Sequence, residues 1–243
     1  MTDAAAYADM WLHDNGTEAI WQFAMIKGQE TGPNTLGSAF SGIIDVLPRP
    51  SYIPTTTVLN LYDQENDIRY AAYFTYDSID AQSVSDFMLT YCKKWPGNPE
   101  LYDGKSNNVN KTKAFRISEM YLIAAEAYAM SGDETNASKI LNELKAARIK
   151  GWSEKTYSGN ALMKEIQNEY VRELFAEDPH IFNMKRWKVG LNRSTSEAQV
   201  VSYLPALGTD MVKPADNHMW VWPIPKEEID SNPQIKGQQN EGY

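Results

Sequence analysis

The sequence predicts a mainly α protein, in which a tetratricopeptide-like helical repeat scaffold joins an irregular, loop-rich lobe that contains a few short strands. Two observations support the scaffold. An Ala-rich apolar run over 115–130 is followed, after Gly132, by an amphipathic run, and a further helical pattern covers 160–178. A third observation, the density of Gly and Pro before residue 113, supports the lobe. We expect a single domain over 1–243, made of the loop-rich lobe (1–113), the helical hairpin scaffold (114–189) and a C-terminal wrap (190–243).

The composition is that of a folded, acidic protein rich in aromatic residues. Hydrophobic residues make up 42% of the 243 residues and charged residues 23%, which is typical of globular chains. The net charge of −9 disfavours nucleic acid as a partner, because that affinity comes mainly from Lys and Arg on phosphates. The seven Trp and fourteen Tyr suit sugar faces and protein interfaces, and they equally suit a core built of aromatic rings.

Cys92 is the single cysteine, so the chain can form neither an internal disulfide nor a cluster of thiolate ligands. Its apolar runs are far shorter than the ~18 residues that a membrane helix needs. The segment after Met1 has neither the basic start nor the apolar stretch of a signal peptide. Either the mature protein is intracellular, or these residues belong to a longer chain.

In the loop-rich lobe, three segments carry a regular pattern. Partial alternation over 18–25 predicts a short strand, 57–62 a short helix and 68–76 a second strand. The segments 28–57 and 77–113 are long, polar and irregular. Because structureless stretches of this length inside a domain are usually functional or mobile, we interpret these two loops as the parts that determine function.

The scaffold begins with an antiparallel helical hairpin. Its first helix covers 115–130, and Asp133 is expected to cap the second, which ends in basic residues before Gly151. Bulky and small residues lie at the spacings of the tetratricopeptide pattern, namely Tyr121, Ala124, Ala125, Tyr128, Ala137 and Leu141. A single repeat of this kind cannot bury both of its faces, so stacked neighbours are expected.

Further elements follow the hairpin. A third helix is expected from Asn160 to Asp178, because a large apolar residue recurs at every fourth position. Asp178 then caps a short fourth helix, which begins at Pro179 and runs to Trp187. The remaining patterns predict a polar loop over 190–218, a short strand over 219–223 and a helical turn over 225–229.

Four glutamates form a stripe on the third helix: Glu165, Glu169, Glu173 and Glu177. Such a stripe suggests acid–base catalysis or a metal site. However, the carboxylates of a glycosidase face each other across the substrate from separate elements, ~5–10 Å apart, so one helix cannot supply both. We therefore favour ion pairing with Arg172, Lys185 and Arg186.

The sequence supports neither a metal nor a cofactor. Asp63, Glu65 and Asp67 have the spacing of a calcium loop, but Ile68 and Phe74 occupy the positions that require Gly and Glu. The three histidines have no metal-binding or catalytic spacing, and the chain has no glycine-rich phosphate loop. We expect no cofactor, no metal and no catalytic residue.

Sugar binding requires a ring for the apolar face of the sugar and amide or guanidinium groups for its hydroxyls. The irregular segments contain both kinds of side chain. The candidate ligand-binding residues are Asn34, Arg49, Tyr52, Tyr91, Trp95 and Tyr102.

Four segments, ordered along the chain, carry a family resemblance. They are Tyr62 with Asp67-Ile68-Arg69; Phe115 to Ala127; Glu169, Arg172, Glu173, Leu174 and Glu177 with Arg186-Trp187; and the C-terminal Ile224-Pro225, Glu228-Ile229, Asn232-Pro233 and Gln239 to Tyr243. Together they resemble the C-terminal portion of the SusD/RagB family of outer-membrane nutrient-binding lipoproteins. Asp178 replaces the usual glycine of that pattern and Asn183 a common Asp, both at positions that concern helix packing.

The resemblance implies that the shared motif residues maintain the scaffold. These structural residues are Arg116, Glu119, Tyr121, Glu126, Glu169, Arg172, Glu173, Glu177, Arg186 and Trp187. It also implies non-catalytic binding of an oligosaccharide or polysaccharide at the outer-membrane surface, for delivery to a SusC-like TonB-dependent transporter.

Family members are longer, and their N-terminal half carries the lipidated cysteine and most of the repeat helices. The resemblance therefore implies a surface-exposed lipoprotein whose anchor is not in this chain, and it makes the missing N-terminal half a partner. Two alternatives stay open. One is a helical-repeat scaffold that binds a protein without a glycan site of its own; the less favoured is a glycoside hydrolase that uses the Glu173 and Glu177 region.

Overall fold

The computed structural model divides into two compact units, Met1–Asp178 and Pro179–Tyr243, and each is described here by itself. The prediction of a single domain over 1–243 stays a prediction. The described residues are 3–28, 35–41, 43–44, 47–48, 50–79, 87–102, 104, 108–177, 180–194, 197–199 and 212–243.

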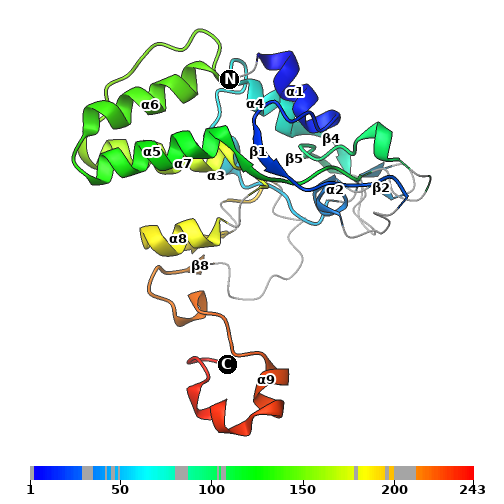
Figure 1. Cartoon of the computed structure of the whole chain (residues 1–243), viewed down its shortest axis with the longest axis vertical. Coiled ribbons are helices and arrows are strands. Elements are labelled where there is room, and N and C mark those ends of the chain that lie inside the picture. Colours follow the sequence, from blue (N-terminus) through cyan, green and yellow to red (C-terminus); the bar gives the residue numbers. More distant parts are fainter. Residues whose placement is uncertain are drawn as a thin grey trace. The chain divides into compact units, whose positions relative to one another are not determined.

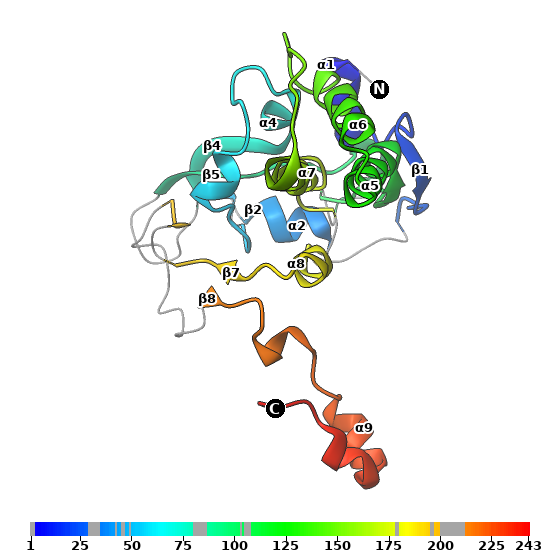
Figure 2. The same cartoon turned by 90° about the vertical axis from the view of Figure 1, so that its left-hand side faces the viewer.

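The lobe of the first unit combines short helices with two-stranded sheets (Figures 1 and 2). Its helices are α1 (Ala4–Leu12), α2 (Leu36–Ser41), α3 (Thr56–Leu59), α4 (Ile68–Tyr73) and the 3-10 turn η1 (Pro99–Leu101). Its strands are β1 (Ala19–Gln22), β2 (Ile43–Ile44), β3 (Leu47–Pro48), β4 (Phe74–Ile79), β5 (Phe87–Cys92) and β6 (Lys113–Arg116). The pairs β1–β6, β2–β3 and β4–β5 are all antiparallel.

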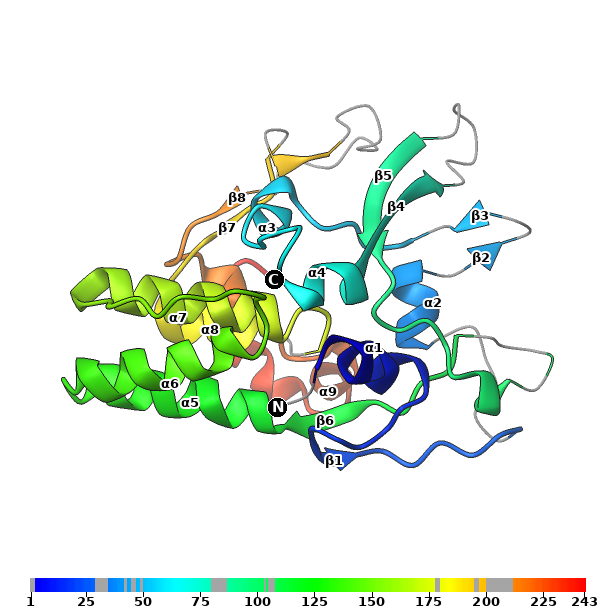
Figure 3. The same ribbon diagram turned by 90° about the horizontal axis from the view of Figure 1, so that it is seen from above.

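The helical scaffold has the predicted hairpin (Figure 3). Helix α5 spans Ile117–Met130, α6 Glu134–Ala146 and α7 Gly159–Glu173, and α5 packs against both of the others. The side chain of Asp133 accepts a hydrogen bond from the backbone N–H of Asn136 at 3.1 Å, so the predicted cap of the second helix is confirmed. The capping bond satisfies a donor that a helix start otherwise leaves unpaired.

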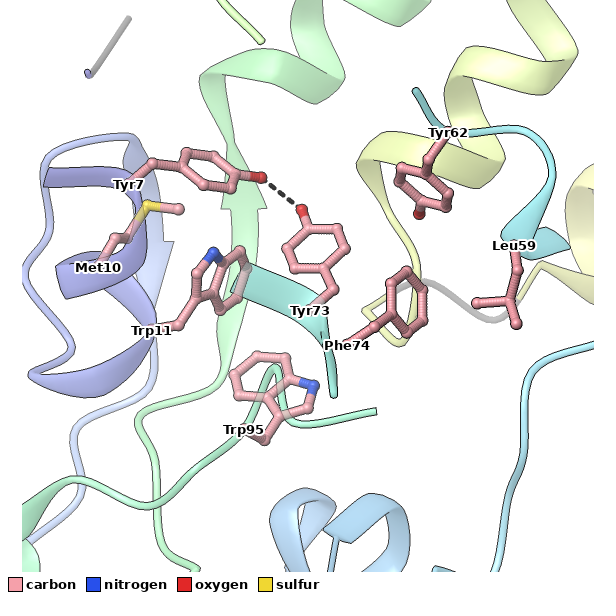
Figure 4. Packing of buried hydrophobic residues seen from close by; sticks show 8 residues of the cluster. All are labelled: Tyr7, Met10, Trp11, Leu59, Tyr62, Tyr73, Phe74 and Trp95. Carbon is pink, nitrogen blue, oxygen red and sulfur yellow. Dashed lines mark hydrogen bonds between the residues drawn. The ribbon is translucent and has the colours of Figure 1, made fainter. Parts of the chain in front are cut away.

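An aromatic cluster forms the core of the lobe (Figure 4). Its buried members are Tyr7, Met10, Trp11, Leu59, Tyr62, Tyr73, Phe74 and Trp95. The Trp11 ring meets the Trp95 ring edge to face at 5.2 Å and the Tyr73 ring at 5.8 Å, which is the arrangement that the ring quadrupoles favour. The hydroxyls of Tyr7 and Tyr73 are hydrogen-bonded to each other, so the polar ends of these rings are satisfied inside the core.

The second unit consists of short elements. They are α8 (Ile181–Trp187), β7 (Leu191–Asn192), β8 (Val212–Lys213), the 3-10 turn η4 (His218–Trp220), α9 (Lys226–Ser231) and the 3-10 helix η5 (Pro233–Gln238). Strands β7 and β8 pair antiparallel. The side-chain amide of Gln239 accepts from the N–H of Ile224 at 2.8 Å and donates to its carbonyl at 3.1 Å, which fastens the C-terminal segment to the chain before α9.

The structure confirms the mainly α fold class, the hairpin, a strand within 18–25 and a short helix near 57–62. It corrects the prediction for 68–76, because only β4 is extended there and residues 68–73 form α4. Arg69 and Tyr73 lie one helical turn apart and are both 0% exposed, so a helical period, not an alternating one, buries this segment.

The structure differs from the sequence analysis at three further places, one element that was not predicted and two predictions that were wrong. The α1 helix was not foreseen, α7 ends at Glu173 instead of Asp178, and a 3-10 turn at His218–Trp220 replaces the strand expected over 219–223. The predicted cap at Asp178 and helix start at Pro179 fall outside the described residues. In α7 the residue after the helix, Leu174, is no longer helical, and Ala176 has a positive φ of 59°, which ends the helical path.

Candidate functional site

The candidate ligand-binding residues fall into three groups. Asn34 and Arg49 lie outside the described residues. Tyr52 and Tyr102 lie in irregular segments with side chains 58% and 49% exposed, and the Tyr52 ring stands 5.6 Å from that of Phe40. These two tyrosines therefore present ring surface to solvent, as a sugar site requires.

Trp95 and Tyr91 belong instead to the buried interior. Trp95 is 1% exposed, packs against Trp11 and donates its indole N–H to the carbonyl of Ala176 at 2.9 Å. Tyr91 lies on β5 opposite Thr75 and is 8% exposed, and burial raises the pKa of its hydroxyl. We correct the interpretation of both residues, because a ring enclosed by the lobe has no free face for a ligand in this fold.

The glutamate stripe of α7 leads to an ionic cluster inside the first unit. Glu173 accepts hydrogen bonds from three arginines. Its Oε1 accepts from Nη1 of Arg116 and from Nη2 of Arg148, both at 2.9 Å. Its Oε2 accepts from Nη1 of Arg69 at 2.9 Å and from Nε of Arg148 at 3.0 Å. All four side chains are at most 1% exposed, so the carboxylate is surrounded by cationic donors and removed from water.

The neighbouring glutamates are held in the same way. Glu169 accepts from Nη1 of Arg69 at 2.5 Å and from Nε of Arg172 at 2.8 Å. Glu177 accepts two hydrogen bonds from Arg116, both at 2.7 Å, and one from Nζ of Lys94 at 2.5 Å. Each carboxylate of this helix end therefore shares at least one cation with the next, which makes the pairs a connected network.

The buried ion pairs of the first unit are balanced in charge. Among the described residues, ion pairs with buried or half-buried partners join seven cations to seven carboxylates. The cations are Arg69, Lys94, Lys113, Arg116, Lys145, Arg148 and Arg172, and the carboxylates are Asp14, Glu18, Asp67, Glu165, Glu169, Glu173 and Glu177. Equal numbers matter because an unpaired buried charge costs several kcal/mol.

The electrostatics oppose a general-acid role for Glu169 and Glu173. Burial by itself would raise the pKa of Glu173, but Arg148, Arg116 and Arg69 hold it well below the ordinary value. For Glu169 the opposing cations, Arg172 foremost, lower the pKa to about 2. A general acid needs a pKa raised toward the working pH, and these carboxyls have no proton to donate at neutral pH.

Ion pairing of the stripe was expected, and its partner Arg172 is confirmed. The other expected partners, Lys185 and Arg186, lie in the second unit, where Nε of Arg186 donates to Asn183 at 3.1 Å and its guanidinium stands 4.7 Å from the Trp187 ring. The partners missed were Arg69, Lys94, Arg116, Lys145 and Arg148. An arginine or lysine side chain can pair with a buried carboxylate, so the residue type was a signal. These residues come from segments distant in the sequence, so helical spacing could not identify them.

A pocket of about 420 Å³ opens beside the loop that follows α6. Its lining includes Trp152, Asp63 and the cationic side chains of Lys145, Lys150, Lys155 and Arg172. The indole N–H of Trp152 donates to the side-chain oxygen of Asn142 at 3.0 Å, which fixes the ring. Ammonium groups of Lys145 and Lys155 lie 4.5 and 4.8 Å from that ring. The pocket was not foreseen, although a Gly-Trp pair after a basic helix end was visible in the sequence.

A comparison with protein-family models identifies the fold family. The model of the SusD family matches residues 77–243, which is more than half of the chain. The chain belongs to the SusD family. The match contains the α5 segment and the Glu169–Glu177 block, so the resemblance that these two motifs carry is confirmed.

Solved structures of SusD proteins share this fold. A SusD superfamily protein from Bacteroides thetaiotaomicron has a TM-score of 0.75 at 21% identity, and the match covers 99% of this chain and 52% of that one. A SusD superfamily protein from Bacteroides vulgatus gives 0.72 at 20% identity, covering 100% and 50%. A SusD-like carbohydrate binding protein from the same species gives 0.67 at 17% identity, covering 99% and 53%. The chain therefore spans about half the length of these structures. The search of curated proteins gives no match.

In this SusD chain the remaining motif residues lie on α5 and are not gathered at one site. Glu126 is buried and Tyr121 and Glu119 are half-buried. Within the described ranges, no helix combines the length and the apolar character needed to cross a membrane. In the same ranges, no group of three or more His, Cys, Asp or Glu side chains is arranged to hold a metal ion.

Proposed function

We propose that this chain takes part in the non-catalytic binding of an oligosaccharide or polysaccharide nutrient. The observation that carries the proposal is membership of the SusD family, across residues 77–243. A solved structure with the same fold is described as a carbohydrate binding protein, and another as a putative sugar binding protein from Bacteroides vulgatus, with a TM-score of 0.70 at 22% identity.

Binding without hydrolysis is supported by the state of the acidic side chains. Glu173 and Glu177 were the residues considered for a hydrolase, and both accept hydrogen bonds from cations inside the first unit. The pKa of each is lowered, with burial opposed by Arg148 in one and Arg116 in the other. A hydrolase would need one such carboxyl to be protonated and to face the substrate.

The ligand surface that we propose contains Tyr52 and Tyr102. Both rings are exposed on irregular segments, where an apolar sugar face can stack on them. Asn34 and Arg49 remain proposed polar partners, since both can bind hydroxyl groups. The Trp152 pocket is a second place to test, because its lysines would favour a glycan that carries carboxylate groups.

The cellular setting follows from the family. We propose a surface-exposed outer-membrane lipoprotein that delivers its glycan to a SusC-like TonB-dependent transporter. The N-terminal half of the SusD fold would then contribute further contacts to the glycan. Cys92 is 0% exposed, so a lipid anchor would have to be attached elsewhere. The alternative is a protein-binding scaffold, which the exposed apolar side of α5 favours.

Isothermal titration of the native full-length protein against neutral and acidic glycans tests the proposal. We expect at least one glycan to bind and to be recovered at its original length. Tyr52→Ala and Tyr102→Ala should weaken binding about tenfold or more, as the loss of a stacked ring does. Tyr76→Ala is the matched control, because that ring is 65% exposed on a strand. An absence of binding across the panel, or shortened products, would refute the proposal.

A further inference from the structure

The loop after α6, which forms one side of the Trp152 pocket, is fastened to the opposite side by backbone hydrogen bonds. The N–H of Lys150 donates to the carbonyl of Asn66 at 3.0 Å, and the N–H of Ile68 donates to the carbonyl of Arg148 at 2.9 Å. The two sides of the pocket are therefore held together in the absence of a ligand. A site that is formed in advance lowers the entropy cost of binding.

Asn142 of α6 fixes the far part of the same loop. Its side-chain oxygen accepts from the indole N–H of Trp152 and from the backbone N–H of Lys155, both at 3.0 Å. Its side-chain amide group donates to the carbonyl of Lys155 at 2.8 Å and to that of Ser138 at 2.9 Å. These four bonds use the full hydrogen-bonding capacity of the amide, so Asn142 orients Trp152 and is not itself a ligand contact.

The two inner cations of the pocket are already paired. Lys145 and Arg172 both form ion pairs with Glu165, and Nε of Arg172 also donates to Glu169 at 2.8 Å. The side chains of the two cations are only 5% and 7% exposed. Their charge is therefore compensated within the protein and is not what would attract a ligand.

The two outer lysines differ from the inner cations. Lys150 and Lys155 are exposed at the pocket, and among the described residues no carboxylate lies within ion-pairing distance of either ammonium group. Lys155 contacts the Trp152 ring at 4.8 Å, and such a contact is weak for an exposed ammonium. Since the whole chain has a net charge of −9, two unpaired cations at one hollow reverse the local sign and favour an anionic ligand.

The other lining groups favour a sugar over a bare anion. Trp152 is half-buried and its indole is held in place, so the ring provides an apolar surface of fixed orientation. Asp63 also lines the pocket, and hydrogen bonds from Asn66 hold the pKa of Asp63 below its ordinary value. An ionised carboxylate accepts hydrogen bonds from sugar hydroxyls but repels an inorganic anion. The volume of about 420 Å³ is in the range of small-ligand sites.

We propose that the Trp152 pocket is a subsite for a sugar residue that bears a carboxylate group. The sugar ring packs against Trp152, and its carboxylate binds between Lys150 and Lys155. The Lys155 ammonium turns from the indole to the carboxylate, which frees ring surface for the sugar. A hydroxyl of the sugar donates to Asp63. The inference rests on the proposed function, because it takes glycan binding as given and adds the chemical class of the glycan.

Isothermal titration of the native protein with uronate trimers tests this assignment. The probes are trimers of galacturonate and of mannuronate, each beside its methyl ester, which has the same rings without the charge. At least one acidic trimer should bind about tenfold or more tightly than its ester, which is the scale of a hydrogen bond to a charged group. Equal affinities for acid and ester, or binding of neither acidic trimer, would overturn the proposal.

Variants place the charge effect at the pocket. Lys150→Gln combined with Lys155→Gln should weaken binding of the acidic trimer about tenfold or more and leave the ester unchanged. Lys139→Gln is the matched control, because it removes one exposed ammonium from α6 outside the pocket lining. All of these lysines are exposed, so the melting temperatures should equal that of the native protein. Equal affinities of the double variant and the control for the acidic trimer would contradict the assignment.

The pattern of results separates this subsite from the proposed surface of Tyr52 and Tyr102, neither of which lines the pocket. A protein that binds a neutral glycan but neither acidic trimer refutes the subsite alone, whereas a protein that binds no glycan refutes the proposed function as well. Loss of the acidic trimer on Tyr52→Ala and Tyr102→Ala, with the lysine variant unaffected, would also refute the subsite. Inorganic sulfate that binds as tightly as the trimer would show a site for a bare anion and overturn the sugar assignment.

Discussion

Arg148 and Glu173 meet through a two-point contact in the interior of the first unit. Nε of Arg148 lies 3.0 Å from Oε2 of Glu173 and Nη2 lies 2.9 Å from Oε1, and both side chains are 0% exposed. Arg148 follows α6 and Glu173 ends α7, so the contact ties the hairpin to the third helix. The same arginine donates to both oxygens of Glu18, at 3.1 and 2.6 Å, which brings the β1 region into the network.

The ionic network makes stability depend on acid pH. The pKa of Glu169 is about 2 in the folded chain, against an ordinary value of 4.5, because Arg172 and Arg69 outweigh the effect of burial. The unfolded chain therefore binds more protons between these values. The stabilisation from Glu169 is present above pH 4.5 and is lost as the pH falls toward 2. The difference between the two pKa values corresponds to about 3 kcal/mol in free energy of unfolding.

Urea unfolding at a series of pH values measures this effect. The free energy of unfolding should fall steeply between pH 4.5 and pH 2, because the unfolded chain takes up the proton that the shifted carboxylate does not bind in the folded chain. In Glu169→Gln the fall should be shallower, whereas Glu143→Gln, an exposed change on α6, should follow the wild type. A flat profile over this range would contradict the assignment.

Gly37 is required by a close approach of backbone. A Cβ atom at this position would lie 2.5 Å from the carbonyl oxygen of Trp95 and 2.7 Å from that of Asn108, both backbone atoms. Gly37→Ala should therefore destabilise the chain by about 1–3 kcal/mol. Gly16→Ala is the matched control, since nothing lies within 4 Å of its added methyl. Thermal unfolding of the two variants checks this, and equal stabilities would count against the packing described.

Trp95 supports the core and not a ligand. Trp95→Ala removes a ring that is 1% exposed, so it should cost about 3–5 kcal/mol in free energy of unfolding. Tyr102→Ala, at a ring 49% exposed, should change it by no more than about 0.5 kcal/mol. Denaturant titrations of both variants make the comparison. Equal losses in free energy of unfolding for Trp95→Ala and Tyr102→Ala would contradict the assignment of Trp95 to the core and Tyr102 to the surface.

The Cys92 thiol should be unreactive in the native chain. Its side chain is 0% exposed, and burial raises its pKa to about 11, so the thiolate is scarce at pH 8. A thiol reagent at that pH should label one equivalent only after the chain is unfolded in guanidinium. Full labelling of the native chain within seconds would show that β5 opens easily.

The sequence predicted the structure best in segments where one periodicity of apolar residues dominates. The hairpin, its Asp133 cap and the mainly α fold class followed from helical spacing, and the family motifs agreed with them. The ionic network did not follow, because Arg116 is 57 residues from Glu173 and Arg69 is 104 residues away. Spacing reports neighbours on one helix and contains no information about which distant arginine enters the interior.

The candidate ligand residues show the same limit. Trp95 and Tyr102 both lie in irregular segments, and their local composition does not distinguish them. The difference arises because Trp11 of α1 covers Trp95, whereas Tyr102 lies on an open turn. Since α1 was not foreseen, the burial of its partner could not be predicted either.

The central claim is that the glutamates of α7 maintain the scaffold through buried pairs, and a double-mutant cycle on Arg148 and Glu173 tests it most directly. Arg148→Met and Glu173→Gln should each cost about 3–5 kcal/mol in free energy of unfolding, because each leaves a buried partner uncompensated. The double variant should cost less than the sum of the two single costs, and the difference, which is the coupling energy, should be about 0.5–3 kcal/mol. Single costs below about 1 kcal/mol that simply add would contradict the account.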